Sequence, residues 1–150
     1  MRGVYTATFK ISGLNAQKTL MYLTAPAAKV VEIIAATVTN ESNVTNQQFE
    51  VQIANITTLG TPTATVVTPT PHEAGDQAAG STVKANVTAS EPTYGSVLTQ
   101  EGAASLPGYR FEPQPDERIY VAPGASIGIR MMTTPTAMDT DIRLTFREIG

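Results

Sequence analysis

The stretch EPQPDERIYVAPGASIGIRMM, residues 112–132, shows the clearest local pattern in the chain. Pro113 and Pro115 fix φ and cannot donate a backbone hydrogen bond, which predicts a turning connection. Residues 118–121 are rich in β-branched and aromatic side chains, and we expect a short β-strand there. In residues 127–132, large apolar side chains occupy every second position, the period of a strand with one buried face.

Pro123 and Gly124 lie between these two predicted strands and are the residue types of a type II turn. Proline presets φ at the first central position, and glycine accepts a positive φ at the second. Two strands joined by so short a turn predict a β-hairpin. None of its side chains forms a pattern of catalytic chemistry.

The same alternation predicts strands along the rest of the chain. They are expected at residues 4–11, 19–24, 29–39, 49–53, 97–99, 109–112 and 142–147. Residues 30–34 are apolar on both faces, as in a central strand, and strands near both termini would share one sheet. No window shows helical period over three turns. About eight or nine short strands with Pro/Gly turns predict an all-β fold, a jelly-roll or related antiparallel β-sandwich.

Residues 57–93 interrupt this pattern. Thr, Pro, Gly and Ala dominate there, and only residues 65–67 and 83–87 favour strand. Irregular stretches of this length are uncommon within a compact domain. We therefore expect residues 57–93 to form a surface excursion, partly pinned by short strands, within a single domain of residues 1–150.

Composition narrows the classes of function. The net charge of -3 argues against a nucleic-acid groove, which needs a basic stripe. The absence of cysteine excludes disulfides, thiolate metal sites and cysteine nucleophiles. No apolar run approaches the ~20 residues of a membrane-spanning helix, and the first residues lack the apolar region of a signal peptide. We expect a soluble protein that binds neither nucleic acid nor membrane.

Candidate catalytic and metal-binding residues are few. His72, Asp76 and Ser81 could supply the residue types of a catalytic triad, but they have no nucleophile-elbow pattern, and an exposed loop histidine is favoured. The acidic pairs at 116–117 and 139–141 are too small for a calcium loop and are typical of solvated turns. The sequence therefore predicts a non-enzymatic protein with no metal and no cofactor.

Several stretches resemble, in order along the chain, a family of small all-β proteins of tailed bacteriophages. The stretches are Ala25–Val31, Thr68–Pro71, Gly75–Val83, Gly95–Leu98, Pro113–Arg118, Val121–Gly124 and Leu144–Ile149. The chain departs from the family at His72, where an aliphatic residue is expected.

This resemblance implies a capsid decoration (cement) protein of jelly-roll type: a virion structural protein that stabilises the head by bridging capsomers. It implies a homo-oligomer, with a trimer favoured, on the outer surface of the capsid, with the major capsid protein as partner. Residues 68–83 of the excursion and the Pro-rich turn at 113–117 would then contact neighbouring copies or the shell. The candidate protein-contact residues are Pro69, Pro71, His72, Asp76, Pro113, Pro115, Asp116 and Glu117.

A second class of function is kept open: a carbohydrate-binding β-sandwich module of a tail or host-attachment device. Tyrosine rings stack on sugars when they form an exposed platform. Tyr94 and Tyr109 are the residues expected to supply such a platform.

Overall fold

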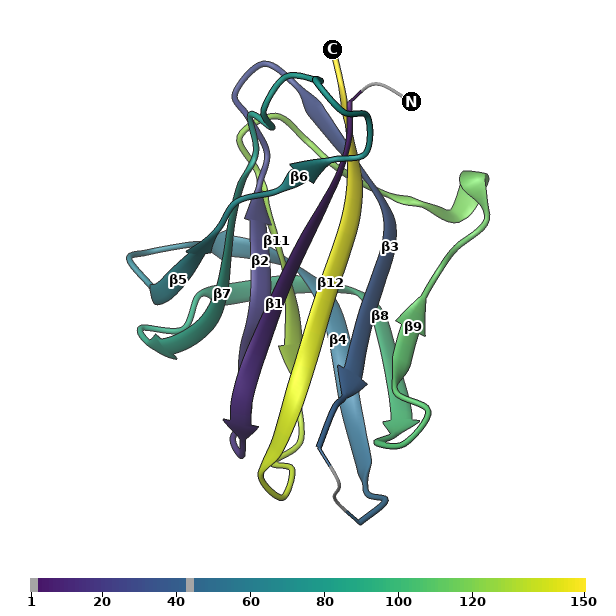
Figure 1. The fold of residues 1–150 in the computed structure, drawn as a ribbon. Coiled ribbons are helices and arrows are strands. Elements are labelled where there is room, and N and C mark those ends of the chain that lie inside the picture. The colour runs from purple at the N-terminus through teal and green to yellow at the C-terminus, as the bar shows by residue number, and fades with distance from the viewer. Residues whose placement is uncertain (1–2, 43–44) are drawn as a thin grey trace.

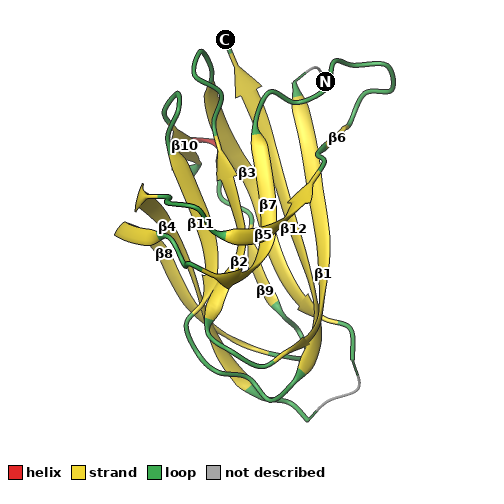
Figure 2. Cartoon of the chain, turned by 90° about the vertical axis from the view of Figure 1, so that its left-hand side faces the viewer, coloured by secondary structure: helices red, strands yellow, loops and turns green. Residues whose placement is uncertain are grey.

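The computed structural model describes residues 3–42 and 45–150, and they fold into two antiparallel six-stranded sheets packed face to face (Figures 1 and 2). The predicted all-β sandwich is confirmed. The strands are β1 (Val4–Leu14), β2 (Lys18–Thr24), β3 (Val30–Asn40), β4 (Gln48–Thr58), β5 (Thr63–Val67), β6 (Thr70–Pro71), β7 (Thr82–Ala89), β8 (Thr93–Ala104), β9 (Tyr109–Phe111), β10 (Ile119–Val121), β11 (Ser126–Met131) and β12 (Met138–Ile149), with one 3₁₀ turn, η1 (Pro115–Glu117). The sequence also predicts a turn at residues 40–43 or a polar loop that reaches Gln48, and Asn43 and Val44 of this stretch lie outside the described residues.

The strand order is that of a jelly roll. The first sheet, called sheet A, has the order β10-β3-β12-β1-β6, with β9 also paired to β3. The second, sheet B, has the order β5-β7-β2-β11-β4-β8. If β9 and β10 are taken as one interrupted strand beside β3, the chain contains two four-stranded sheets, β1-β12-β3-β9/β10 and β2-β11-β4-β8. Those two sheets form the eight-stranded jelly-roll core.

The remaining strands lie within the expected surface excursion, residues 57–93. The residues there that favour strand, 65–67 and 83–87, lie in β5 and β7, whereas β6 was not expected. β7 pairs with β2 and β5, and β6 pairs with β1. These strands raise the count to twelve over the described residues. β6 escapes a search for apolar alternation because it consists of two residues, Thr70 and Pro71, whereas Val83, Ala85 and Val87 are buried on β7.

The predicted hairpin at 118–132 is also wrong, although its strands and its turn are present. The Ala125 N–H donates to the Ala122 carbonyl at 3.0 Å, and Gly124 has a φ of 73°, as a type II turn requires. However, β10 pairs with β3 in sheet A, whereas β11 lies between β2 and β4 in sheet B. A type II turn splays the strands it joins, unlike the primed turns of tight hairpins. Here the turn carries the chain from one sheet to the other.

The two terminal strands share sheet A, as the sequence predicts. β1 pairs with β12 from Val4 opposite Arg147 to Leu14 opposite Met138. β1 runs past the predicted end at Ile11 through a register shift that includes Gly13, whose φ is 64°. The inward-facing side chains of both sheets form one core, and those of β11 and β12 are Ile127, Ile129, Met131, Met138, Ile142, Leu144 and Phe146. No helix among the described residues has the length and apolar character needed to cross a membrane.

Candidate functional site: two contact segments and an outer depression

Residues 69–76, here called the edge segment, lie along the free edge of sheet A beside β1. Thr70 pairs with Thr6 and Pro71 with Tyr5. The His72 N–H donates to the Val4 carbonyl at 2.9 Å, and the His72 Nε2 lies 2.5 Å from the Thr6 hydroxyl. The segment is therefore fixed to β1 by backbone and side-chain hydrogen bonds.

Asp76 closes the edge segment. Its Oδ2 accepts a hydrogen bond from the Gly3 N–H at 3.0 Å, and its Oδ1 accepts one from the Gln77 N–H at 2.9 Å. Ser81 is buried, and its hydroxyl donates to Glu148 at 2.8 Å. His72, Asp76 and Ser81 thus have separate partners and do not form a catalytic triad.

Residues 113–117, here called the tip segment, connect β9 to β10 and project from the side of the sandwich, at the right in Figure 1. The Glu117 N–H donates to the Gln114 carbonyl at 2.9 Å within the 3₁₀ turn. Pro115, Asp116 and Glu117 are exposed, and Pro113 is half-buried. The two prolines and the 3₁₀ hydrogen bond restrict the backbone of this projection.

A buried carboxylate holds the base of the tip segment. Glu32 on β3, whose side chain is 5% exposed, accepts a hydrogen bond from the Arg118 guanidinium at 3.1 Å. The Tyr120 hydroxyl donates to the same oxygen, Oε1, at 3.3 Å, and the Arg147 guanidinium lies 3.5 Å from the other oxygen, Oε2. A carboxylate so enclosed by cations fixes the position at which the chain leaves the tip and enters β10.

The two contact segments are not brought together. The edge segment contains β6 at one edge of sheet A, and the tip segment lies between β9 and β10 at the opposite edge. The sequence does not reveal this arrangement, because nothing in the local pattern states which strands form the edges.

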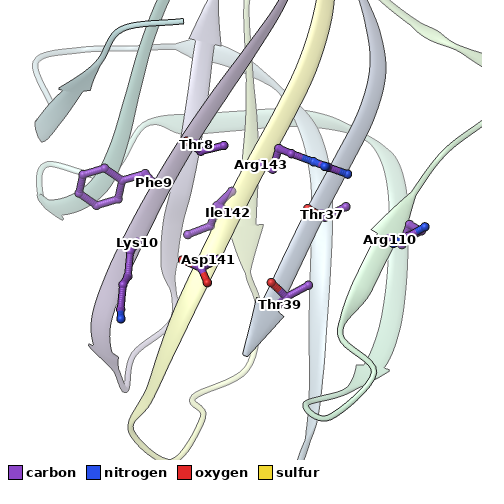
Figure 3. Close-up of a pocket in the computed structure, with 9 residues that line it drawn as sticks. All are labelled: Thr8, Phe9, Lys10, Thr37, Thr39, Arg110, Asp141, Ile142 and Arg143. Carbon is purple, nitrogen blue, oxygen red and sulfur yellow. The ribbon is translucent and has the colours of Figure 1, made fainter. Parts of the chain in front are cut away.

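The outer face of sheet A carries a shallow depression of about 560 Å³ (Figure 3). We call it the outer depression. Its polar lining comes from β1, β3, β9 and β12 and includes Thr8, Lys10, Thr37, Arg110, Asp141 and Arg143. Sequence reasoning missed it, because its residues are far apart in the chain and meet only through strand pairing.

The expected tyrosine platform is absent from the structure. Tyr109 is 2% exposed and packs in the core. The Tyr94 hydroxyl lies 2.6 Å from the Thr19 hydroxyl, and the Arg130 guanidinium carbon lies 4.2 Å from the centre of the Tyr94 ring. Burial raises the pKa of Tyr94 to about 12. Both rings are engaged within the protein, so the prediction that these two tyrosines form an exposed platform is wrong.

Metal-binding groups do not cluster in the part of the chain that the structure describes. No group of three or more His, Asp or Glu side chains is placed to hold a metal ion there. Asp139 accepts a hydrogen bond from the Gly13 N–H at 2.9 Å. Burial, and then the nearby Glu41 carboxylate, raise the pKa of Asp141.

The chain matches no family model, no curated protein and no solved structure in the comparisons. Strand order therefore defines its class: a jelly-roll β-sandwich with an inserted segment that contains β5, β6 and β7.

Proposed function

We propose that this chain is a capsid decoration (cement) protein of a tailed bacteriophage. It is a non-enzymatic virion protein that lies on the outer surface of the capsid as a homotrimer. It stabilises the head by bridging capsomers of the major capsid protein. The observation that carries the proposal is the placement of two exposed, internally braced contact segments at opposite edges of one sheet.

Bracing matters because a preorganised loop loses little conformational entropy when it binds. The edge segment is fastened to β1 through His72 and to Gly3, the residue before β1, through Asp76. The tip segment is restricted by its prolines and fastened through Arg118 to the buried Glu32. Both segments could therefore dock on a rigid partner at a small ordering cost.

Placement at opposite edges supports contacts between unlike surfaces. When one patch of a subunit meets a different patch of the next, the contact is heterologous and closes into a ring if the rotation permits. The edge and tip segments are two such patches on one sheet. The strands at these edges, β6, β9 and β10, are two or three residues long, and short edges limit uncontrolled strand addition.

The alternative, a carbohydrate-binding module of a tail or attachment device, receives less support. Its aromatic platform was expected at Tyr94 and Tyr109, and both rings are engaged within the protein. Tyr120 is the exposed tyrosine among the described residues, and a lone ring is a small stacking surface.

The first test is quantitative mass spectrometry of gradient-purified virions from the source phage. We expect a copy number of the same order as that of the major capsid protein. A few copies per particle would move the protein to the tail or a vertex, and absence from the particle would overturn the proposal.

The second test compares two matched charge reversals in binding to capsids that lack the protein. Asp116→Arg changes the tip segment, whereas Glu101→Arg changes an exposed position on β8 in sheet B. We expect Asp116→Arg to lower capsid occupancy at least about tenfold, as loss of a central interface contact does, and Glu101→Arg to bind as the wild type does. Equal capsid binding by the two variants would show that the tip segment is not part of the interface.

A further inference from the structure

The outer depression gathers hydrogen-bonding groups that the protein itself does not use. Over the described residues, the Arg143 guanidinium and the hydroxyls of Thr8, Thr37 and Thr39 form no hydrogen bond or ion pair. These groups come from three adjacent strands, β1, β3 and β12. Four unengaged polar groups around one concavity are the kind of lining that a polar ligand satisfies.

Strand pairing arranges the lining in rows across the sheet. Thr8 lies opposite Arg143, Arg143 opposite Thr37, and Thr37 opposite Arg110. In the neighbouring row, Lys10 lies opposite Asp141, which lies opposite Thr39. Figure 3 shows these side chains spread over the outer surface of the strands, whereas Phe9 points away from the others.

Arg143 is the unneutralised cation of the lining. The Lys10 ammonium pairs with Glu41 at 2.8 Å, and the Arg110 guanidinium pairs with Glu112 at 3.5 Å. The guanidinium of Arg143 can bind a carboxylate through two parallel hydrogen bonds. Asp141, in the next row, is instead an acceptor.

This mixture of donors and an acceptor discriminates among ligands. A small anion without a hydroxyl group, such as acetate, would satisfy Arg143 but would face the Asp141 carboxylate without offering it a donor. A neutral sugar would engage Asp141 and the threonine hydroxyls but would leave Arg143 unpaired. A sugar acid carries both a carboxylate and hydroxyl donors, and the volume of about 560 Å³ lies within the range of small-molecule pockets, roughly 300–1,000 Å³.

We propose that the outer depression is a binding site for a saccharide that carries a carboxylate. Arg143 binds the carboxylate, and Asp141 and the threonine hydroxyls bind the sugar hydroxyls. Phe9, the aromatic residue of the lining, points away from the other side chains (Figure 3), so a single site binds weakly. Several copies on one particle strengthen attachment through multivalency. The site goes beyond the proposed function, because none of its lining residues belongs to the edge segment or the tip segment.

The test is a nuclear magnetic resonance titration of the isotope-labelled full chain with three probes: glucuronate, glucose and acetate. We expect glucuronate to shift the amide signals of Thr8, Thr37 and Thr39. Glucuronate should bind at least about tenfold more tightly than glucose or acetate, because loss of a charge-assisted hydrogen bond costs that much or more. If acetate binds as tightly as glucuronate, the site recognises only the carboxylate. If glucose binds as tightly as glucuronate, Arg143 plays no part in binding. Either result overturns the proposal.

Matched variants place the binding on the depression. Arg143→Gln, with a signal dispersion that confirms folding, should weaken glucuronate binding at least about tenfold, whereas Lys84→Gln on β7 of sheet B should leave it unchanged. Unchanged binding by Arg143→Gln overturns the assignment. The assignment is also overturned if the Thr8 and Thr37 signals move with protein concentration in the absence of sugar. The depression would then be covered by a second copy of the chain. The titration uses no capsid, so its failure is distinct from failure of the decoration proposal.

Discussion

Gly128 is a position where a neighbouring side chain dictates the residue. It lies in the middle of β11, between β2 and β4, and its φ is not positive. A Cβ at this position would overlap the Tyr94 ring, with the Tyr94 Cε1 at 2.9 Å. The absence of a side chain at Gly128 therefore leaves the space in which Tyr94 packs on the outer surface of sheet B.

Gly128→Ala is expected to lower the free energy of unfolding by about 1–3 kcal/mol, because inserting a methyl group into a packed site forces its neighbours to move. Urea unfolding checks this value. Gly102→Ala is the matched control: Gly102 is an exposed glycine on β8 whose Cβ would have its nearest neighbour, the Phe49 carbonyl oxygen, at 3.9 Å. We expect a change within about 0.5 kcal/mol for the control.

A Tyr94→Ala background isolates the cause. With the ring removed, the added methyl group at position 128 has room, and its cost should fall well below that measured in the wild type. An undiminished cost would show that the backbone of β11, and not Tyr94, requires glycine.

At the scale of elements, the connection from β6 to β7 is held down by one buried carboxylate. The side chain of Glu148 on β12 is 1% exposed, and its carboxylate forms an ion pair with the Lys29 ammonium at 3.0 Å. It also accepts hydrogen bonds from the Ser81 N–H at 2.7 Å and the Ser81 hydroxyl at 2.8 Å. Burial by itself would raise the pKa of Glu148, but these partners outweigh burial, and its pKa lies below the ordinary value of 4.5.

A lowered pKa in the folded state makes the carboxylate a source of stability above the unfolded value of 4.5. That stability is lost as the pH falls through the folded pKa. We therefore expect the wild type to lose stability below about pH 4.5 more steeply than Glu148→Gln does, as measured by thermal unfolding across the acid range.

Asp141→Asn provides a control of opposite sign. Because the folded pKa of Asp141 is raised, the folded state binds that proton more readily than the unfolded state, and the wild type should gain stability relative to this variant as the pH falls. Parallel acid profiles for the wild type and Glu148→Gln would exclude Glu148 as the group responsible.

At the scale of the whole molecule, the first and last strands lie side by side in sheet A. β12 separates β1 from β3, so sheet A cannot be completed until residues near the two ends of the chain have met. β11 likewise joins β2 to β4 in sheet B. Such long-range pairing requires the closure of long loops, and the conformational entropy lost in closing them is offset only after the strands have made contact.

We expect refolding from urea on a time scale of roughly milliseconds to seconds, as for other sandwich folds. Stopped-flow fluorescence measures the rate. A double-jump experiment, in which the chain is unfolded only briefly, separates this step from slow proline isomerisation. Refolding in microseconds after a brief unfolding pulse would contradict the dominance of long-range pairing.

The local pattern of residues decided which segments become strands and which faces they bury. Ile142, Leu144 and Phe146 alternate with polar residues, and all three are buried on β12. The residues Pro123 and Gly124 form the type II turn that their types predict. Such features follow from the chain because alternation and backbone preference act over a few residues.

Only the tertiary structure decided how the strands are combined. The same Pro-Gly turn joins two sheets instead of forming a hairpin. The excursion at residues 57–93 adds β6 at an edge of sheet A and β5 and β7 at an edge of sheet B. Tyr109 is buried, and the outer depression unites Thr8, Thr37 and Arg143 from distant parts of the chain. Periodicity states which side of a strand is apolar but not which strand lies beside it. Strand order depends on the competition among all long-range pairings for one core.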